Sequence, residues 1–170
     1  KRQILGTGGG GDPYIGMLMA TQALDRGKRI VLVHPDIIED DSMVIPVAAM
    51  GTPTVLIEKI PSGKEALYAL KLIEDYHGKK ASYVSPAEAG GINSTIPLVV
   101  AAERNIAVVD GDGMGRAFPE LQMVTFHLYG IKATPMSLAD ERGNAVLLDA
   151  VNTFWAEKLA RVITVRFGGT

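Results

Sequence analysis

VVDGDGMGRAFPE, residues 108–120, is the stretch of the chain that decides its fold. It begins with a β-branched run typical of a buried strand, and two carboxylates, Asp110 and Asp112, follow directly. Glycines alternate with these carboxylates, Arg116 comes next, and a proline at an early helical position predicts a helix over residues 119–129. Open α/β sheets bind their ligands at the carboxyl ends of strands, in loops of this kind. The stretch therefore predicts a strand, a ligand-binding loop and a helix in succession.

The rest of the chain alternates short apolar runs with amphipathic segments in the same way. Strands are expected at residues 3–5, 29–34, 81–84, 106–109, 133–138 and 145–150, with two strands or a strand and a turn at 44–50 and 54–57. Helices are expected at residues 13–26, 64–77, 94–104, 119–129 and 153–167, with Gly78 ending the second and Asn152 capping the last. Nearly continuous apolar strands between helices indicate a sheet that is buried on both sides. We predict one α/β domain over residues 1–170, in three layers, with a mostly parallel or mixed sheet and helices on both faces.

Composition narrows the class of protein. Hydrophobic residues make up 47% and charged residues 21% of the chain, as in a folded globular domain. The net charge of −2, without a cluster of Lys or Arg, gives no electrostatic footprint for nucleic acid. The absence of cysteine excludes a disulfide framework, a thiolate nucleophile and a thiolate metal site. The longest apolar run, residues 96–102, is far shorter than the roughly 20 residues that span a bilayer. We expect a cytoplasmic enzyme domain that binds a small molecule and has no nucleic-acid or membrane partner. Whether it forms a homo-oligomer is left open.

A first glycine-rich loop lies between the strand at 3–5 and the helix at 13–26. Residues 6–11 satisfy G-x-G-x-x-G, the pattern of dinucleotide-binding loops, although a run of four glycines satisfies almost any glycine pattern. Asp12 before Pro13 is expected to cap the helix, which puts a carboxylate where a pyrophosphate would bind. A dinucleotide, a small ligand approached by backbone, and a purely structural turn all remain open. The substrate-binding candidates of this loop are Gly8, Gly9, Gly10 and Asp12.

A second loop of the same kind follows the strand at 81–84. Glu88 is followed by paired glycines, Gly90 and Gly91, and then by Asn93 and Ser94 ahead of an apolar helix. In one interpretation Asn93 or Ser94 caps the helix and the glycines only turn the chain. In the other, Glu88 points from the strand end into a shared pocket and Asn93 donates a hydrogen bond there. We carry Glu88 as a catalytic candidate and Gly90, Gly91 and Asn93 as substrate-binding candidates.

The charged residues of the loop after residue 109 allow similar alternatives. Asp110 and Asp112 lie two apart, so an extended backbone turns both to one side, where they form an acid–base pair or bind a divalent ion. With mainly oxygen ligands, that ion would be Mg²⁺ or Mn²⁺ rather than zinc. The alternative is a pair of solvated turn aspartates. Arg116 either clamps a substrate carboxylate or pairs with Asp112. Glu120 either contacts substrate or is present only because the helix dipole favours an acidic residue in the first turn.

Four segments taken together resemble a known family, the N-terminal domain of S-methyl-thiohydantoin desulfurases. The segments are residues 6–14, 50–59, 88–93 and 110–120. The family is associated with hydantoinase/oxoprolinase proteins, and its members are about twice as long as this chain and carry a second, C-terminal domain. The chain also begins at Lys1 without a methionine and stops shortly after a helix. The resemblance therefore implies the N-terminal domain of a longer two-domain protein, whose C-terminal domain is a further partner.

The resemblance also implies a reaction, the replacement of sulfur at C2 of a hydantoin-like ring by oxygen in bacterial catabolism. Our leading hypothesis is a hydrolytic domain in which a carboxylate or a metal assists water attack at C2. Its catalytic candidates are Asp110, Asp112, Glu88 and Arg116, and Glu120 joins the substrate-binding group. The alternative is a non-catalytic domain that binds nucleotide or phosphate through its glycine-rich loops, or that serves assembly.

Overall fold

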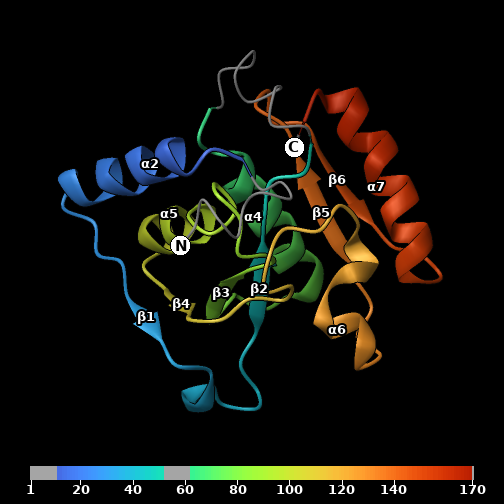
Figure 1. Ribbon diagram of the computed structural model, residues 1–170, viewed down its shortest axis with the longest axis horizontal. Coiled ribbons are helices and arrows are strands. Elements are labelled where there is room, and N and C mark those ends of the chain that lie inside the picture. Colours follow the sequence, from blue (N-terminus) through green and yellow to red (C-terminus); the bar gives the residue numbers. More distant parts are fainter. Residues whose placement is uncertain (1–10, 52–61, 170) are drawn as a thin grey trace.

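Among the residues that the structure describes, four parallel strands form the central sheet (Figure 1). The structure is a computed structural model and describes residues 11–51 and 62–169. In their order across the sheet, the strands are β1 (Leu32–Val33), β4 (Ala107–Val109), β3 (Tyr83–Pro86) and β2 (Val44–Val47). Every neighbouring pair in this sheet is parallel. The carboxyl ends of all four strands therefore lie at one edge, and the loops that follow them meet there.

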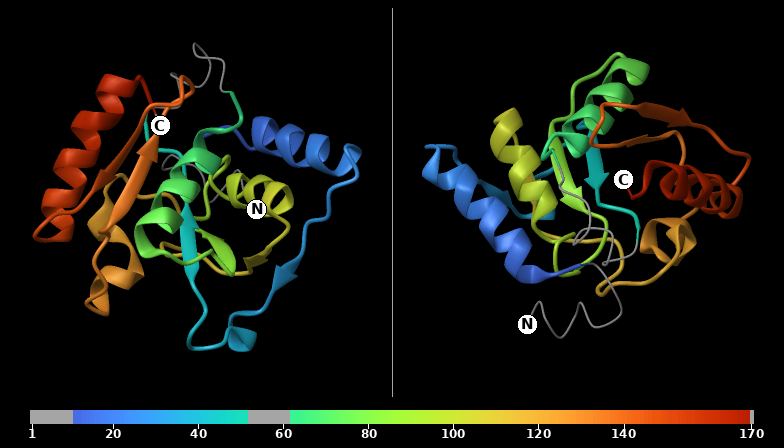
Figure 2. Two further views of the ribbon diagram at one scale, coloured as in Figure 1. Left: turned by 180° about the vertical axis from the view of Figure 1, so that it is seen from behind. Right: turned by 90° about the horizontal axis from the view of Figure 1, so that it is seen from above.

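Two helices stack on one another against this sheet. Helix α5 (Ile96–Arg104) packs on β3 and β4, and α2 (Pro13–Asp25) packs in turn on α5 (Figure 2). The two buried residues of α2, Gly16 and Ala23, are small, so the two helices can approach closely. Asp12 caps α2 as predicted, since its side chain accepts a hydrogen bond of 2.8 Å from the Tyr14 amide.

The main hydrophobic core joins the sheet to α4 (Glu65–His77) and α5. Its buried residues are Val47, Leu70, Ile73, Ala81, Val84, Val100, Ala101 and Val108. Val84 and Val108, from adjacent central strands, are 0% and 1% exposed. Full burial of such a side chain contributes about 1.5–3 kcal/mol. The apolar runs that predicted the strands are thus also a main source of stability.

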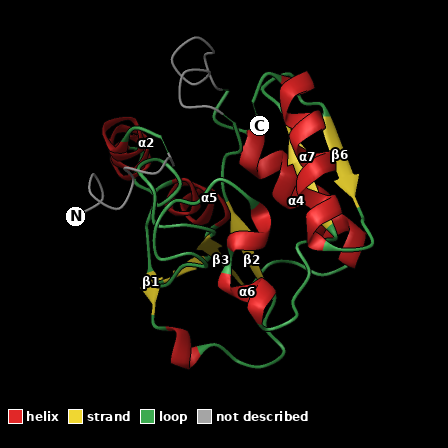
Figure 3. Ribbon diagram, turned by 45° about the vertical axis from the view of Figure 1, so that its right-hand side comes forward, coloured by secondary structure: helices red, strands yellow, loops and turns green. Residues whose placement is uncertain are grey.

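A separate antiparallel hairpin lies between α4 and α7 (Figure 3). Its strands are β5 (Met136–Ala139) and β6 (Ala145–Leu148), and helix α7 (Thr153–Phe167) follows. The buried Asp140 carboxylate closes the hairpin by accepting hydrogen bonds from the Arg142 and Asn144 amides. A second core, which contains Leu138, Leu148 and Ala160, fills the space between the hairpin and α7.

These elements confirm the predicted three-layer α/β class with a parallel sheet, and the antiparallel hairpin adds a second, small sheet. The predicted helix ends at Gly78 and Asn152 are confirmed as well, since Gly78 takes a left-handed conformation and Asn152 accepts from the Trp155 amide. The expected strands at 3–5 and 54–57 lie outside the described residues. No helix in the described ranges is both long and apolar enough to cross a membrane.

The predicted helix over residues 119–129 is wrong. The segment forms a 3₁₀ turn, η3 (Leu121–Met123), and one short helix, α6 (Thr125–Leu128), with extended backbone at Glu120. The reason is a contact with α7. Buried Glu157 accepts from the Leu121 amide at 3.1 Å, and Arg161 donates to the Pro119 carbonyl at 2.7 Å. In a continuous helix the Pro119 carbonyl would accept from the Met123 amide, but it is bound by Arg161, and the Met123 amide donates to the Glu120 carbonyl instead. Tertiary contact therefore overrides local propensity.

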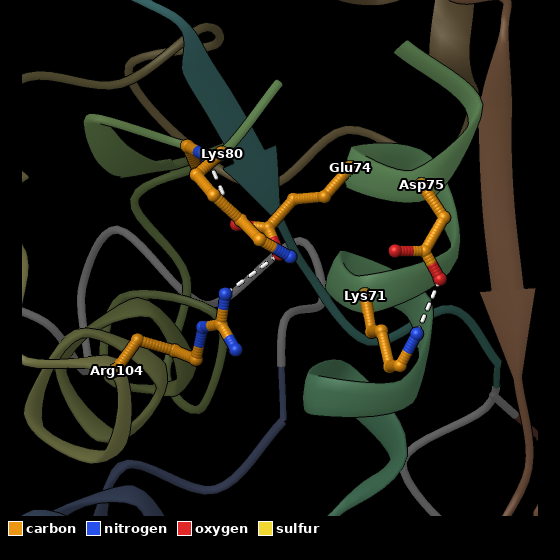
Figure 4. Close-up of polar contacts among 6 residues, drawn as sticks. Lys71, Glu74, Asp75, Lys80 and Arg104 are labelled. Atoms are coloured by element: carbon orange, nitrogen blue, oxygen red, sulfur yellow. Dashed lines mark hydrogen bonds and ion pairs between the residues drawn. The ribbon is translucent and has the colours of Figure 1, made fainter. Parts of the chain in front are cut away.

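At the amino edge of the sheet, a buried carboxylate ties three elements together (Figure 4). Glu74, in the last turn of α4, is 2% exposed. It accepts hydrogen bonds from Arg104 at 2.6 Å, from the Ala81 amide at 2.9 Å and from Lys80 at 3.2 Å. Arg104 ends α5, and Ala81 leads into β3, so one side chain fixes where two strands begin. The sequence pattern did not single out Glu74, because its partners lie up to 30 residues away.

These contacts set the charge state of Glu74. Burial by itself raises the pKa of a carboxyl group, but the Ala81 amide, the hydrogen bond from Lys80 and the charges of Arg104 and Lys80 outweigh it. The net effect is a pKa below the ordinary value. A carboxylate with a lowered pKa in the folded state stabilises the protein above its unfolded pKa. That stabilisation is lost as the pH falls through the folded pKa.

We expect Glu74→Gln to lower the free energy of unfolding by about 1–3 kcal/mol at neutral pH, the usual worth of hydrogen bonds to a charged group. The difference from the wild type should shrink as the pH falls below 4.5, the ordinary value for the group, because the wild type loses the same contribution there. Urea denaturation between pH 3 and pH 8, with about unit spacing, measures both effects. Asp75→Asn, which removes the exposed partner of Lys71, is the control and should leave the midpoint unchanged. A difference that persists at low pH would contradict the assignment.

Candidate functional site

The loops at the carboxyl edge of the sheet are joined through their main chains. The Asp110 amide donates to the Val33 carbonyl at 2.8 Å, which links the ends of β4 and β1. The Gly113 amide donates to the Ala87 carbonyl at 3.1 Å, which links the loop after β4 to the loop after β3. The loop that the sequence marked as most informative therefore contacts two neighbouring strand ends, as its position after a central strand requires.

The loop after β3 contains a buried polar pair. Glu88 is 7% exposed and Asn93 is 6% exposed. The Asn93 amide group donates to a Glu88 carboxylate oxygen at 2.6 Å. Asn93 also donates to the Ala49 carbonyl at 3.1 Å and accepts from the Ala49 amide at 2.8 Å. One side chain thus holds the catalytic candidate Glu88 and the chain that follows β2.

The predicted roles of Asn93 separate clearly in this geometry. Neither Asn93 nor Ser94 caps α5, whose N-cap position is Thr95 without a side-chain cap bond. The Ser94 hydroxyl donates instead to the Gly90 carbonyl. The capping interpretation is therefore wrong. Asn93 donates to Glu88 and to the Ala49 carbonyl, and its role in substrate binding stays a prediction.

The two glycine-rich loops meet at Gly11 and Gly91. A Cβ on Gly91 would fall well inside the contact distance of the Gly11 carbonyl oxygen and lie 3.0 Å from the Pro13 ring. Gly11 itself has φ +78° and packs on Ile92. Only a residue without a side chain permits this approach. The last residue of the first loop therefore lies directly against the second loop, while Gly8, Gly9 and Gly10 lie outside the described residues.

Gly113 makes a similar close approach on the other side of the loop after β3. A Cβ there would lie 3.0 Å from both the Ala87 carbonyl and the Phe126 ring. The Thr125 amide and hydroxyl both donate to the Gly113 carbonyl, at 2.6 Å and 3.0 Å. The glycine fixes this loop between β3 and α6, so the alternating glycines here serve packing as well as loop geometry.

The charged candidates of the loop after β4 lie at the surface instead. Asp110 and Asp112 are both exposed, and one Asp112 oxygen accepts from the amides of Met114 and Gly115 in a local turn. The Arg116 guanidinium lies over the Phe118 ring, 5.3 Å from its centroid, and no ion pair joins it to Asp112 in the described part of the chain. Exposed Glu120 accepts from the Gln122 side chain. The four charged candidates are thus spread over the exposed loop and do not line one buried pocket together with Glu88.

The expected metal site has limited support from the described side chains. Within residues 11–51 and 62–169, no group of three or more His, Asp or Glu side chains is close enough to hold an ion. The loop offers the two carboxylates Asp110 and Asp112, of which Asp112 is partly used by its own turn. Mg²⁺ takes six ligands, so these residues do not by themselves make a site.

Sequence reasoning did not single out two polar features near these loops, the main chain of Ala49 and the hydroxyl of Ser85. Ala49 acts only through its main chain, which no residue-type pattern reveals. Ser85, three residues before Glu88, has a buried hydroxyl without a hydrogen-bond partner in the described structure. A buried hydroxyl left unpaired is uncommon in a native fold. The signal that could have identified Ser85 is the presence of a serine in an otherwise apolar strand.

Comparison with known proteins identifies a family and a solved structure with a similar fold. The family profile described as "S-Me-THD-like, N-terminal domain" matches residues 2–150. A crystal structure of a protein from Chromobacterium violaceum, a Northeast Structural Genomics Consortium target, is similar with 28% sequence identity and a TM-score of 0.76. The similarity covers 96% of this chain and 48% of that one, so this chain spans about half of its length. No curated protein matches the sequence.

The contact between the glycine loops can be tested through stability. We expect Gly91→Ala to lower the free energy of unfolding by about 1–3 kcal/mol or more, because backbone must move to admit the methyl group. Gly111→Ala, in the loop after β4, is the matched control, since a Cβ at Gly111 would have no neighbour nearer than 3.7 Å. Thermal unfolding of both variants measures the difference. Equal stability of Gly91→Ala and the wild type would show that the two loops do not touch in this way.

Proposed function

The chain belongs to the S-Me-THD-like family through its N-terminal domain, and from this we propose that it takes part in replacing the sulfur at C2 of a thiohydantoin ring by oxygen. The chain spans about half of its solved relative, so the activity of the whole protein is part of the proposal. The ring would bind at the carboxyl edge of the sheet, between the glycine-rich loops.

The single observation that carries the proposal is the buried carboxylate of Glu88. It lies at the edge where open parallel sheets bind ligands, and Asn93 orients one of its oxygens at 2.6 Å. Its second oxygen accepts no hydrogen bond from the described residues. A carboxylate that is withdrawn from solvent and oriented by one partner is suited to take and return a proton.

The reaction requires few groups from the protein. Water adds to C2 of an S-methyl-thiohydantoin, a carbon that is doubly bonded to a ring nitrogen; one proton of the water passes to a carboxylate and the other ends on that nitrogen. The carbon–sulfur bond then breaks, and the sulfur takes up the first proton and leaves as methanethiol. The product is the hydantoin carbonyl. Glu88 would take the proton from water and deliver it to the leaving sulfur. Backbone N–H groups of the glycine-rich loops would bind the ring oxygens, whose charge grows during the attack.

The surface candidates would have supporting roles. Arg116, stacked on Phe118 at the outer side of the loop, would attract a substrate carboxylate. Asp110 would be the second proton-transfer group or a metal ligand together with Asp112. Because these two carboxylates supply too few ligands for Mg²⁺, we assign no step to a metal and leave the question to a chelator experiment.

Ligand binding by the 170-residue chain is the direct test. We expect hydantoin and S-methyl-2-thiohydantoin to bind, and Glu88→Gln and Asn93→Ala to weaken binding by about 1–3 kcal/mol, the cost of unpairing a buried polar group. Calorimetric titration measures the affinities. Glu103→Gln is the control, because it removes an acidic side chain at the far end of α5, where Glu103 pairs with Lys28.

The same titration with ADP distinguishes the proposed function from the alternative, a nucleotide-binding domain. Asp12 occupies the Tyr14 amide at the start of α2, so a phosphate would meet a carboxylate there. Binding of ADP without binding of hydantoins would overturn the proposal in favour of a nucleotide-binding domain. Binding of hydantoins that Glu88→Gln leaves unchanged would remove Glu88 from the site.

Thiol release from S-methyl-2-thiohydantoin tests the chemistry. In the protein that carries this chain together with a C-terminal domain, we expect Glu88→Gln to reduce kcat by at least about 100-fold, the usual share of a general acid–base group. Asp110→Asn should have a smaller effect on kcat. Loss of turnover with a chelator, and its return with Mg²⁺ or Mn²⁺, would add a metal to the mechanism. Full turnover by Glu88→Gln would contradict the assignment.

A further inference from the structure

Helix α7 presents a second apolar face to solvent, in addition to the face that packs on the hairpin. Its inner residues Ala156 and Ala160 are fully buried. On the outer side, Trp155, Leu159 and Val162 recur at spacings of four and three residues and therefore share one face. Their exposed fractions are 50%, 40% and 63%. Large exposed apolar faces on a helix mark interaction sites.

A shallow groove continues this face beyond the start of the helix. It is lined by Lys132, Asp149, Ala150, Val151, Trp155 and Leu159. The Trp155 ring is also covered on one side by the Lys158 ammonium group, 5.0 Å from the ring centroid. Tryptophan is enriched at the centres of protein interfaces, where its large ring fills a pocket of the partner. The groove and the helix face together form one continuous surface, which we call the α7 surface.

The position of α7 in the chain indicates what covers this surface. The family domain matches residues 2–150, and α7 begins at Thr153, directly after it. This chain matches 48% of the solved relative, so about half of that protein lies outside the match. A domain that follows the N-terminal family domain would be connected to it close to α7. The apolar face of α2 is less suited, because α2 lies at the opposite end of the molecule (Figures 1 and 2).

Charge argues against a second copy of the chain as the occupant. The cations near the α7 surface are Lys132, Lys158 and Arg166, and the nearby anion is Asp149. With three cations and one anion, two copies of this surface would bring two positively charged faces together, which disfavours association. A partner with an apolar centre and an acidic rim fits better.

We propose that the α7 surface is the docking face for the C-terminal domain that forms the other half of proteins in this family. The domain would cover Trp155, Leu159 and Val162 and present acidic side chains to Lys132 and Arg166. The two halves would then share an apolar interface at α7 in addition to their covalent connection.

Single-cysteine labelling tests the proposal, because the chain contains no cysteine of its own. Val162→Cys reports on the α7 surface, and Leu18→Cys, on the exposed face of α2, is the control. Both variants are prepared in the 170-residue chain and in the chain extended after Thr170 by the second half of the Chromobacterium violaceum protein. Maleimide labelling should slow by about tenfold or more at Val162→Cys upon extension, since labelling requires access to the thiolate. Labelling at Leu18→Cys should change less than about twofold.

A second measurement does not depend on how well the extended chain folds. In the Chromobacterium violaceum structure, the side chains that superpose on Trp155, Leu159 and Val162 should lose most of their exposed area when the second half of that chain is included. Exposure that stays the same there, or equal labelling of Val162→Cys with and without the extension, would overturn the proposal. Labelling of the 170-residue variant that slows with its own concentration, together with a dimer mass, would overturn it in favour of self-association.

Discussion

The candidate site depends on the way the Asn93 side chain binds the main chain of Ala49. By donating to the Ala49 carbonyl and accepting from its amide, Asn93 pairs with the segment after β2 much as a neighbouring strand would. The second N–H of the Asn93 amide group donates to Glu88. An amide side chain can do this because it carries both donors and an acceptor. A carboxylate at position 93 could still accept from the Ala49 amide, but it could not donate to the Ala49 carbonyl, and it would repel Glu88 instead of donating to it.

The glycine residues make this arrangement compact. Gly91 lets the start of α2 pass directly over the loop after β3, and Gly113 lets the loop after β4 lie against the Ala87 carbonyl. Three loops are therefore held together largely by backbone contacts. Backbone amides near a buried carboxylate are suited to bind a small planar ring with carbonyl oxygens on its rim. The same closeness limits the space for a large ligand such as a dinucleotide.

Sequence reasoning was accurate where the pattern is local and failed where partners are distant. The alternation of apolar runs predicted the parallel sheet, and the Asp12, Gly78 and Asn152 signals placed helix ends correctly. The same reasoning placed a helix at 119–129, because it could not detect that Glu157 and Arg161 on α7 bind that backbone. It also gave exposed Asp112 the same weight as buried Glu88. Nothing in either local sequence shows which carboxylate the other loops cover.

The two edges of the sheet differ in the kind of interaction that holds them, and this difference suits the proposed function. At the amino edge, the charged cluster around Glu74 fixes the ends of α4 and α5 to the strands that follow. At the carboxyl edge, the loops are held by backbone hydrogen bonds, by the bonds of the Ser94 and Thr125 hydroxyls to carbonyl groups, and by the Asn93–Glu88 pair. No ion pair among the described residues joins two of these loops, so a ligand that binds between them competes with hydrogen bonds and not with ion pairs. The ion pairs of Glu74, which hold the strand starts at the far edge, would stay intact when a substrate binds.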